Sequence, residues 1–557
     1  MATEQTNVDS ALADAWELQR TGNFVAAYDR AQEALQQWPD SQPLQHLSIL
    51  ALASCGSTKA ALAAFRASSL ASSENEDYLA LEARLLKDLA LRGSAAEAAG
   101  LLAEAAEAYE RIAQRTGGSY TAQNAASLWA LAGDSAQGAR LADTVMQALA
   151  RAAVPTEEQA AYFHWAMTAE AALVLGDRAR LEDAATRASS LCRRNLWART
   201  RTFAQIRRLA DLRPACADII ERWYRPPIAL VLAGEELSRV TTEGGVTEDP
   251  DIPALAYATG TSRESDWQSL AALGVHVHVV LARAGREASG SAASGSAAGG
   301  HPSRQASGHG SHYTWSSLLL DADEDSEELC AQSALGLSLG HAEAVRAPWV
   351  VLGRSSDGWR QYRGIDRASL AGPSGISYTG RPRYGFVFAD AVGYSSLNAA
   401  DTRRYWTRLL PEAAAAVLRR YSDALLFRKT WGDAIHAVFR TATAAGKAAL
   451  EMTAATARLT EELELGRRLA FRVAVHFGAA DTGIDPVEDA MTFFGPQLSF
   501  AARIVPMAPP GGVFVTEPCA AELSLEGAAD IDCAYIGTTS LPKDYARVRL
   551  LTLSARQ

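Results

Sequence analysis

The sequence predicts a multidomain protein in which an α-helical repeat array is followed by a small α/β domain and then by an α+β domain. Its 557 residues leave room for three or four domains. Alanine and leucine recur at helical spacing, with little proline, over residues 8–222. Short apolar runs typical of buried parallel strands follow over residues 226–376. Residues 384–553 combine strand-like runs, a hairpin and acidic turns.

The composition restricts the classes of function. The formal net charge is −11, which argues against a surface for nucleic acids or anionic membranes. The six cysteines are scattered and form no CxxC pair, as expected for thiols in a reducing compartment. The N-terminus is polar, and no apolar run approaches the roughly 18 residues that span a bilayer. We therefore expect a cytoplasmic protein that binds neither nucleic acid nor membrane.

Small-residue turns interrupt the helical segment at regular points. They are expected at Gly22, Gly56, Gly100, Gly133 and Gly176. The first two glycines are 34 residues apart and the next two 33, a period that resembles tetratricopeptide repeats. The following spacing of 43 breaks the period, so an irregular helical bundle remains an alternative. Stacked helix pairs of either kind offer a concave surface, on which we expect a protein partner.

The α/β domain is predicted from short apolar runs separated by helical stretches. The runs begin at Ile228, Ile252, Val275 and Pro348. This pattern favours a small Rossmann-like sheet, although neither the Rossmann glycine motif nor a P-loop is present. The turn at Gly260 could bind a phosphate, or the domain could be a spacer that binds nothing. Residues 285–311 are rich in Gly, Ser and Ala, as in a flexible insert.

Two aspartates carry most of the functional information in the C-terminal domain. Asp390 follows a short apolar run and precedes a turn at Gly393, which predicts a carboxylate at the tip of a strand, beside main-chain N–H groups that can receive phosphate. Asp433 lies on a turn between residues 424–428 and 434–439, which have the pattern of two hairpin arms. If this hairpin pairs beside the first strand, the carboxylates converge and suit Mg²⁺ with a nucleoside triphosphate.

Residues 384–553 resemble the catalytic domain of class III nucleotide cyclases, the adenylyl and guanylyl cyclases. The resemblance continues past the aspartates through further motifs in order. They are Phe471-Arg-Val-Ala-Val-His-Phe-Gly478, Phe494-Gly-Pro-Gln-Leu-Ser-Phe-Ala-Ala-Arg503-Ile, Pro509-Pro-Gly-Gly-Val-Phe-Val-Thr516 and Leu541-Pro-Lys543. The resemblance covers under a third of the chain, and the ordered set makes it specific. It implies an α+β ferredoxin-like cyclase domain.

The resemblance also implies the metal site. A pair of Mg²⁺ or Mn²⁺ ions would be held by Asp390 and Asp433, with the Ala391 carbonyl as a further ligand. One ion would lower the pKa of the ribose 3′-hydroxyl and the other would bind the triphosphate. The turn residues expected to contact the substrate are Val392, Gly393 and Tyr394.

Further roles follow from the resemblance. Arg503 is similar to the family's transition-state arginine, which stabilises charge on the α-phosphate. Lys543 matches a lysine that contacts the triphosphate. Lys429 falls where adenylyl cyclases carry lysine and guanylyl cyclases glutamate, and a lysine can donate to adenine N1. Thr492 occupies the second base-reading position, where a hydroxyl can accept from the adenine amino group. Ser499 replaces the family's usual ribose-orienting asparagine, so we expect a reduced rate.

These roles predict an enzyme that converts ATP to 3′,5′-cyclic AMP and pyrophosphate. In the family, one cyclase domain supplies the metal ligands and another supplies the base- and ribose-contacting residues. A single such domain therefore implies a homodimer. The two preceding domains would act as sensors of a partner or ligand. Two alternatives stay open, a weak or inactive cyclase-fold scaffold that binds nucleotide and protein partners, and a cyclase that uses GTP or a pyrimidine triphosphate. Lys429 argues against GTP only.

Overall fold

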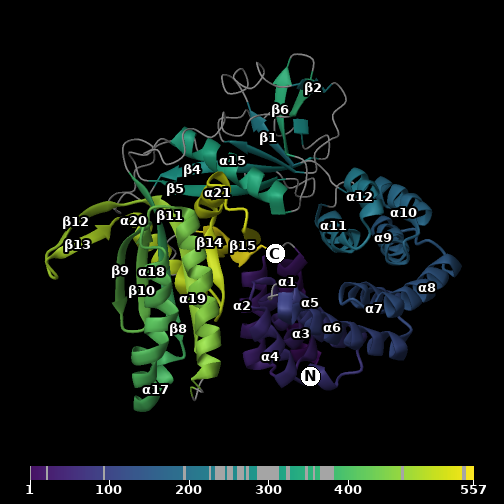
Figure 1. Cartoon of the computed structure of the whole chain (residues 1–557), viewed down its shortest axis with the longest axis horizontal. Coiled ribbons are helices and arrows are strands. Elements are labelled where there is room, and N and C mark those ends of the chain that lie inside the picture. Colours follow the sequence, from purple (N-terminus) through teal and green to yellow (C-terminus); the bar gives the residue numbers. More distant parts are fainter. Residues whose placement is uncertain are drawn as a thin grey trace.

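The chain is divided into three regions along its length (Figure 1). The computed structural model describes residues 2–20, 23–91, 95–191, 196–224, 228–232, 245–247, 255–259, 269–270, 275–284, 313–320, 326–344, 349–355, 358–363, 382–463, 465, 469–541 and 547–556. A helical region extends to residue 224, a first sheet lies between residues 228 and 363, and a second sheet begins at residue 383. This order confirms the predicted succession of helical, α/β and α+β architecture.

The helical region forms an arc that begins beside the C-terminal sheet and ends beside the middle sheet (Figure 1). Its helices are α1 (Ala2–Arg20), α2 (Phe24–Gln37), α3 (Gln42–Ser54), α4 (Thr58–Ala67), η1 (Ser69–Ser72), α5 (Glu76–Ala90), α6 (Ala95–Thr116), α7 (Ser119–Leu131), α8 (Ser135–Arg151), α9 (Glu158–Leu175), α10 (Arg178–Ser190), α11 (Leu196–Asp211), η2 (Pro214–Cys216) and α12 (Ala217–Tyr224). Neighbouring helices contact one another, as in α/α repeats. None of the described helices combines the length and apolar character needed to cross a bilayer.

The glycine turns are confirmed in part. Gly56, Gly133 and Gly176 follow α3, α7 and α9 with φ of 93°, 98° and 76°, a left-handed conformation that glycine adopts without strain. Gly100 lies inside α6, so the turn expected there is wrong. An isolated glycine costs a helix only about 1 kcal/mol, which the surrounding alanines and leucines outweigh. Gly22 lies outside the described residues.

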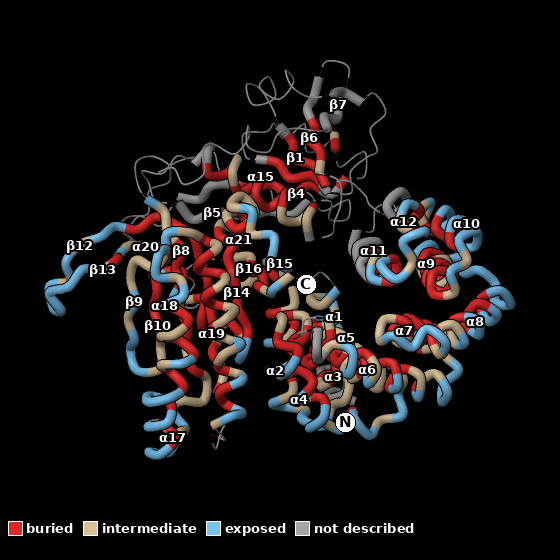
Figure 2. The backbone as a smooth tube through the Cα atoms, viewed as in Figure 1, coloured by how far each residue is buried: buried red, intermediate tan, exposed pale blue. Residues whose placement is uncertain are grey.

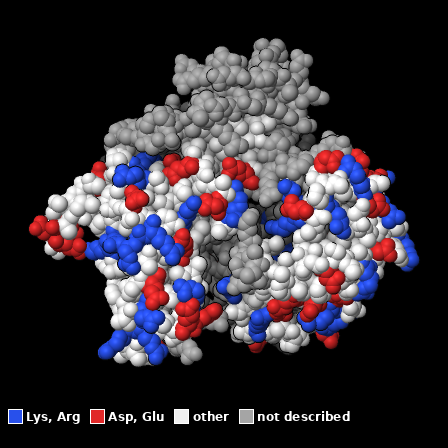
Figure 3. Space-filling view, in the orientation of Figure 1, with Lys and Arg blue, Asp and Glu red and all other residues white. Residues whose placement is uncertain are grey.

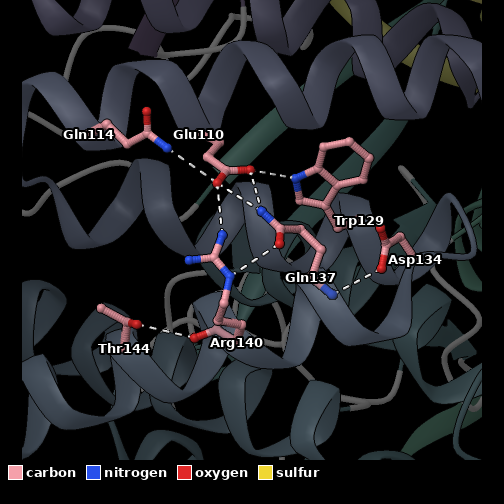
Figure 4. Close-up of polar contacts among 7 residues, drawn as sticks. All are labelled: Glu110, Gln114, Trp129, Asp134, Gln137, Arg140 and Thr144. Carbon is pink, nitrogen blue, oxygen red and sulfur yellow. Dashed lines mark hydrogen bonds and ion pairs between the residues drawn. The ribbon is translucent and has the colours of Figure 1, made fainter.

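A carboxylate joins three consecutive helices in the middle of the array (Figure 4). The Glu110 carboxylate on α6 accepts hydrogen bonds from Trp129 Nε1 on α7 at 2.8 Å and from Gln137 Nε2 on α8 at 2.9 Å. Arg140 Nη2, also on α8, donates to it at 3.2 Å. Because this side chain is only 12% exposed, these donors replace water around its charge and fix the relative positions of the helices.

The middle region is built around a seven-stranded sheet in the order β2-β7-β6-β1-β3-β4-β5. Its described elements are β1 (Ile228–Leu232), β2 (Gly245–Thr247), β3 (Leu255–Thr259), β4 (His276–Ala284), β5 (Tyr313–Leu320), α15 (Ser326–Ala344), β6 (Trp349–Ser355) and β7 (Gly358–Arg363). Parallel pairing joins β6, β1, β3, β4 and β5, which confirms the predicted parallel α/β sheet. Gly260 and residues 285–311 lie outside the described residues.

The C-terminal region contains a second seven-stranded sheet, in the order β15-β16-β14-β11-β8-β10-β9. Its strands are β8 (Arg383–Val392), β9 (Leu425–Trp431), β10 (Ala434–Phe439), β11 (Ala470–Ala479), β14 (Val513–Thr516), β15 (Ile531–Ser540) and β16 (Arg547–Ala555), with a separate hairpin of β12 (Asp481–Asp485) and β13 (Ala490–Phe494). Its helices are η4 (Tyr394–Ser396), α17 (Ala399–Arg404), η5 (Tyr405–Leu409), η6 (Pro411–Ala415), α18 (Ala416–Arg420), α19 (Ala442–Glu462), α20 (Pro496–Ile504), η7 (Val505–Met507) and α21 (Glu517–Leu525).

The first half of this region confirms the ferredoxin-like expectation. In chain order it reads β8, helices, β9, β10, α19 and β11, which is a βαββαβ unit. The four strands lie in the order β11-β8-β10-β9 with antiparallel pairing throughout. The hairpin expected around Asp433 is therefore present and pairs beside β8, as predicted.

Different helices pack against the two faces of this sheet. Val387, Ala389 and Ile435 pack toward α19 in one large apolar cluster. The alternate residues Phe386 and Phe388 point to the opposite side, where α20 lies, so we call it the α20 face. Figure 2 shows buried positions running along these strands and α19. Acidic and basic side chains both occur over the described part of the surface that is visible in Figure 3.

Glu110 provides a test of the helical array. Replacing it with alanine should lower the local free energy of opening of α6–α8 by about 1–3 kcal/mol, because Trp129 and Gln137 lose a charged acceptor. Hydrogen exchange measured by mass spectrometry over these helices checks this. Glu107→Ala, at an exposed position on the same helix, should change it by less than about 0.5 kcal/mol. Equal protection in both variants would contradict the assigned role.

Candidate active site

The pairing of β8 with β10 brings the two aspartates together. Asp390 lies opposite Ala434, and Asp433 is the residue directly before Ala434, in the short turn that contains Gly432. Burial raises the pKa of the Asp433 carboxyl, and the charge of Asp390 raises it further, while a hydrogen bond from its own main chain lowers it. The expected convergence of the carboxylates is therefore present. Asp390 lies two residues inside β8 and not at its last residue, because β8 continues to Val392.

Arg472 is a site residue that the sequence reasoning missed. It lies opposite Asp390 in the pairing of β11 with β8. Its Nε and Nη2 donate to Asp390 Oδ2 at 2.8 and 2.5 Å. Alternation along the strand shows only that Arg472 lies on the opposite face from Phe471 and Val473, and its partner depends on the register with β8. Its guanidinium partly neutralises the pair of carboxylates.

The glycine turn after β8 is held by aromatic side chains. Gly393 has a φ of 92° and begins the short helix η4. The ring of Tyr394 packs against Tyr405 at a centroid distance of 4.8 Å, and its hydroxyl accepts from Trp406 Nε1 at 2.9 Å. The Tyr405 hydroxyl donates to the Asp433 carbonyl at 3.5 Å, so this cluster ties the two turns together. We therefore expect any phosphate contact of Tyr394 to come from its main-chain N–H.

The base-reading candidates lie on β9 and on the β12–β13 hairpin. Lys429 pairs across the hairpin with His436 and lies on the α20 face. Its Nζ forms an ion pair with the Glu488 carboxylate and lies 5.4 Å from the centre of the Trp431 ring. Thr492 lies on β13 opposite Gly483 and is half-buried. Glu488 was not anticipated, because it is distant from Lys429 in sequence and belongs to none of the recognised motifs.

Helix α20 carries Ser499 and Arg503 one turn apart, as expected. Ser499 is exposed and Arg503 is half-buried, while Phe500 and Ile504 are buried beneath them. The polar and apolar residues thus occupy different sides of the helix. Lys543 lies outside the described residues.

A buried histidine fixes the beginning of α20. His476 on β11 contacts Thr516 Oγ1 through Nδ1 at 2.8 Å and Gln497 Oε1 on α20 through Nε2 at 2.8 Å. Burial lowers the pKa of His476 to about 3, although the bond to Gln497 acts in the opposite direction. The imidazole is therefore neutral, with Nε2–H donating to Gln497 and Nδ1 accepting from the Thr516 hydroxyl. This network sets the position of α20, and with it Ser499 and Arg503.

The donor set suits a hard divalent cation. Asp390, Asp433 and the Ala391 carbonyl offer the oxygen ligands that Mg²⁺ and Mn²⁺ prefer, and crowding of two carboxylates is relieved by a cation. Among the described residues, no group of three or more His, Cys, Asp and Glu side chains is assembled that would hold a metal by itself. A site of two carboxylates leaves coordination positions open for phosphate oxygens and water.

Comparison with known proteins gives a family model and a curated relative that match parts of the chain. A family model described as Tetratricopeptide Repeats-Sensor matches residues 23–129. The protein "Putative adenylate cyclase 3" of Rhizobium meliloti (strain 1021) is 30% identical over 131 residues, or 23% of this chain. The match spans only 21% of that relative's length.

Solved structures similar to this chain include cyclases of both specificities. The adenylyl cyclase CyaB from P. aeruginosa is 16% identical, with 31% of this chain and 93% of that chain covered and a TM-score of 0.27. An adenylate cyclase from Trypanosoma brucei, in its monomeric state, is 20% identical, with 31% and 92% covered and a TM-score of 0.26. The guanylyl cyclase Cya2 is 19% identical, with 31% and 92% covered and a TM-score of 0.27.

The fold of the C-terminal region is assigned from its βαββαβ topology and from the ordered motifs of its sequence. The chain carries tetratricopeptide sensor repeats near its N-terminus, and its C-terminal third has the fold of class III nucleotide cyclases.

Proposed function

We propose that this protein is an adenylate cyclase, which converts ATP to 3′,5′-cyclic AMP and pyrophosphate at the interface of a homodimer. The convergence of Asp390 and Asp433 beside the Gly393 turn is the observation that carries the proposal. The position of Lys429 on the same face of the sheet supports ATP as the substrate, because an ammonium group can donate to adenine N1.

The metal site would be formed by Asp390, Asp433 and the Ala391 carbonyl. Bound Mg²⁺ or Mn²⁺ would supply Lewis-acid activation of the ribose 3′-hydroxyl and charge neutralisation of the triphosphate. Arg472 holds Asp390 through two hydrogen bonds to one oxygen. Its guanidinium is partly exposed, and a triphosphate presents the oxygen acceptors that an arginine fork prefers. We infer that Arg472 exchanges the carboxylate for a phosphate oxygen when substrate binds.

The remaining residues would orient the reacting groups. The ribose 3′-hydroxyl would lose its proton to solvent, its oxygen would form a bond to the α-phosphorus, and the bond from that phosphorus to the pyrophosphate oxygen would break. Arg503 would stabilise the charge that develops on the α-phosphate. Ser499, one helical turn before it, would orient the ribose with a shorter reach than an asparagine. Lys543 would contact the triphosphate, as its family motif implies.

We infer that the helical region regulates this site through the buried apolar cluster that supports α20. Val25 on α2 and Cys55 after α3 belong to the same buried cluster as Phe500 and Ile504 of α20. Asn23 Oδ1 accepts from the Thr538 main-chain N–H at 3.0 Å, so the start of α2 is also hydrogen-bonded to β15. A partner or ligand that shifts α2 would therefore shift the apolar support of the helix that carries Arg503.

The middle region is joined to the same sheet from another side. Helix α15 packs against α21, and a Cβ added at Gly336 would lie 2.4 Å from the Ala521 carbonyl oxygen. Only glycine permits this approach of the two helices. The middle region is thus positioned to act as a second sensor domain.

The substrate assignment predicts the product. Purified protein incubated with Mn²⁺ and each of the four ribonucleoside triphosphates should form cyclic AMP and pyrophosphate from ATP at the highest rate. Chromatography with mass detection identifies the product. Absence of any cyclic nucleotide, with the protein folded and dimeric, would exclude a cyclase, and a higher rate with GTP would reject the base assignment.

The metal assignment predicts the effect of Asp433→Asn. A neutral amide is a poor ligand for a hard cation, so Mn²⁺ binding measured by electron paramagnetic resonance should weaken at least about 10-fold. Cyclase activity should fall at least about 100-fold, because the metal supplies several kcal/mol of charge stabilisation. Asp423→Asn, which removes an exposed aspartate just before β9, is the matched control. Equal Mn²⁺ binding in both variants would show that Asp433 is not a ligand.

The regulatory contact predicts the effect of Val25→Ala. Removing two buried methyl groups should loosen α20, seen as faster hydrogen exchange over residues 496–508, and should slow turnover by roughly 10-fold through misplacement of Arg503. Val154→Ala, at an exposed position between α8 and α9, serves as the control. Unchanged exchange over α20 in Val25→Ala would refute the proposed coupling.

A further inference from the structure

The ion pair between Lys429 and Glu488 joins the edge strand β9 of the sheet to the turn of the β12–β13 hairpin. Lys429 is the candidate base-reading residue on β9, and its side chain is 23% exposed. Glu488 lies in the turn between β12 and β13 and is 47% exposed. A carboxylate therefore stands beside the ammonium group at the place where the base is expected.

The hairpin turn holds Glu488 in a defined conformation. Asp485 Oδ1 accepts from the main-chain N–H groups of Val487 at 2.8 Å and Glu488 at 3.3 Å. The turn closes through the Asp489 N–H, which donates to the Asp485 carbonyl at 2.9 Å, and Asp489 has a φ of 49°. Because these bonds order the main chain before any ligand binds, little conformational freedom remains to be lost at Glu488.

The pair matches the hydrogen-bonding edge of adenine. Adenine presents an acceptor at N1 and a donor in its 6-amino group, and the pair presents an ammonium donor beside a carboxylate acceptor. A charged acceptor forms a stronger hydrogen bond than the hydroxyl of Thr492. That hydroxyl also lies 3.5 Å from the Phe493 carbonyl of its own strand.

We propose that Glu488 is a specificity-determining residue whose carboxylate accepts from the adenine 6-amino group, while Lys429 donates to N1. This inference rests on the proposed adenylate cyclase function and deepens it. In this structure the two side chains pair with each other. Since both are partly exposed, their ion pair is weak and opens readily to admit the base.

The test compares ATP with purine riboside 5′-triphosphate, which lacks only the 6-amino group. The ratio of kcat/KM for the two nucleotides is expected to be at least about 10-fold in the wild type, as for one good base-edge contact. Glu488→Ala should bring this ratio close to unity, and Glu488→Gln, which retains a neutral acceptor, should give an intermediate value. Asp489→Asn removes a charge from the same turn at a residue type that tolerates positive φ, and should keep the wild-type ratio.

The outcomes separate this inference from the proposed function. A wild-type ratio retained in Glu488→Ala, with cyclic AMP still formed, would overturn the role of Glu488 alone. Failure of the wild type to form any cyclic product would overturn the proposed function. In that case calorimetry gives the Kd of each nucleotide, and the ratio of the two Kd values replaces the kinetic ratio. A ratio near unity in the wild type, or no binding of either nucleotide, would overturn the inference.

Discussion

The candidate site depends on the register between β8 and β10. That register sets Ala434 opposite Asp390, and since a tight turn precedes Ala434, it brings Asp433 to the same edge of the sheet. A shift by one residue would turn Asp390 toward α19 and separate the carboxylates. Burial of Val387, Ala389 and Ile435 on the α19 side opposes such a shift. The apolar core thus determines where two like charges are held together, and the guanidinium of Arg472 partly compensates them.

The sequence could predict the elements whose pattern is local. The alternation in β8, the hairpin around Asp433 and the helix with Ser499 and Arg503 follow from periodicity and motif order. The glycine spacing predicts a turn at Gly100, but a single glycine does not show whether its neighbours sustain a helix. The contacts of Arg472 and Glu488 depend on pairing between segments distant in sequence, which no local pattern records.

The helical and middle regions each share a buried apolar cluster with the C-terminal region. The proposed regulation acts through these contacts. The helical region contributes Val25 to the cluster beneath α20, and α15 of the middle region packs against α21. Both contacts end on helices that flank the same sheet. The sensor repeats and the cyclase fold are each recognisable from the sequence. The hydrogen bond between Asn23 and Thr538, which connects them, is not, because the two residues belong to segments far apart in the chain.

A crystal structure with Mn²⁺ and a non-cyclisable ATP analogue would test the central claim most directly. The account predicts anomalous density for manganese within coordination distance of both Asp390 and Asp433 of one protomer. It also predicts that Arg472 leaves Asp390 for the phosphates, and that the base lies beside Lys429 of the second protomer. Nucleotide bound elsewhere, with Arg472 still paired to Asp390 and no metal between the aspartates, would contradict the account.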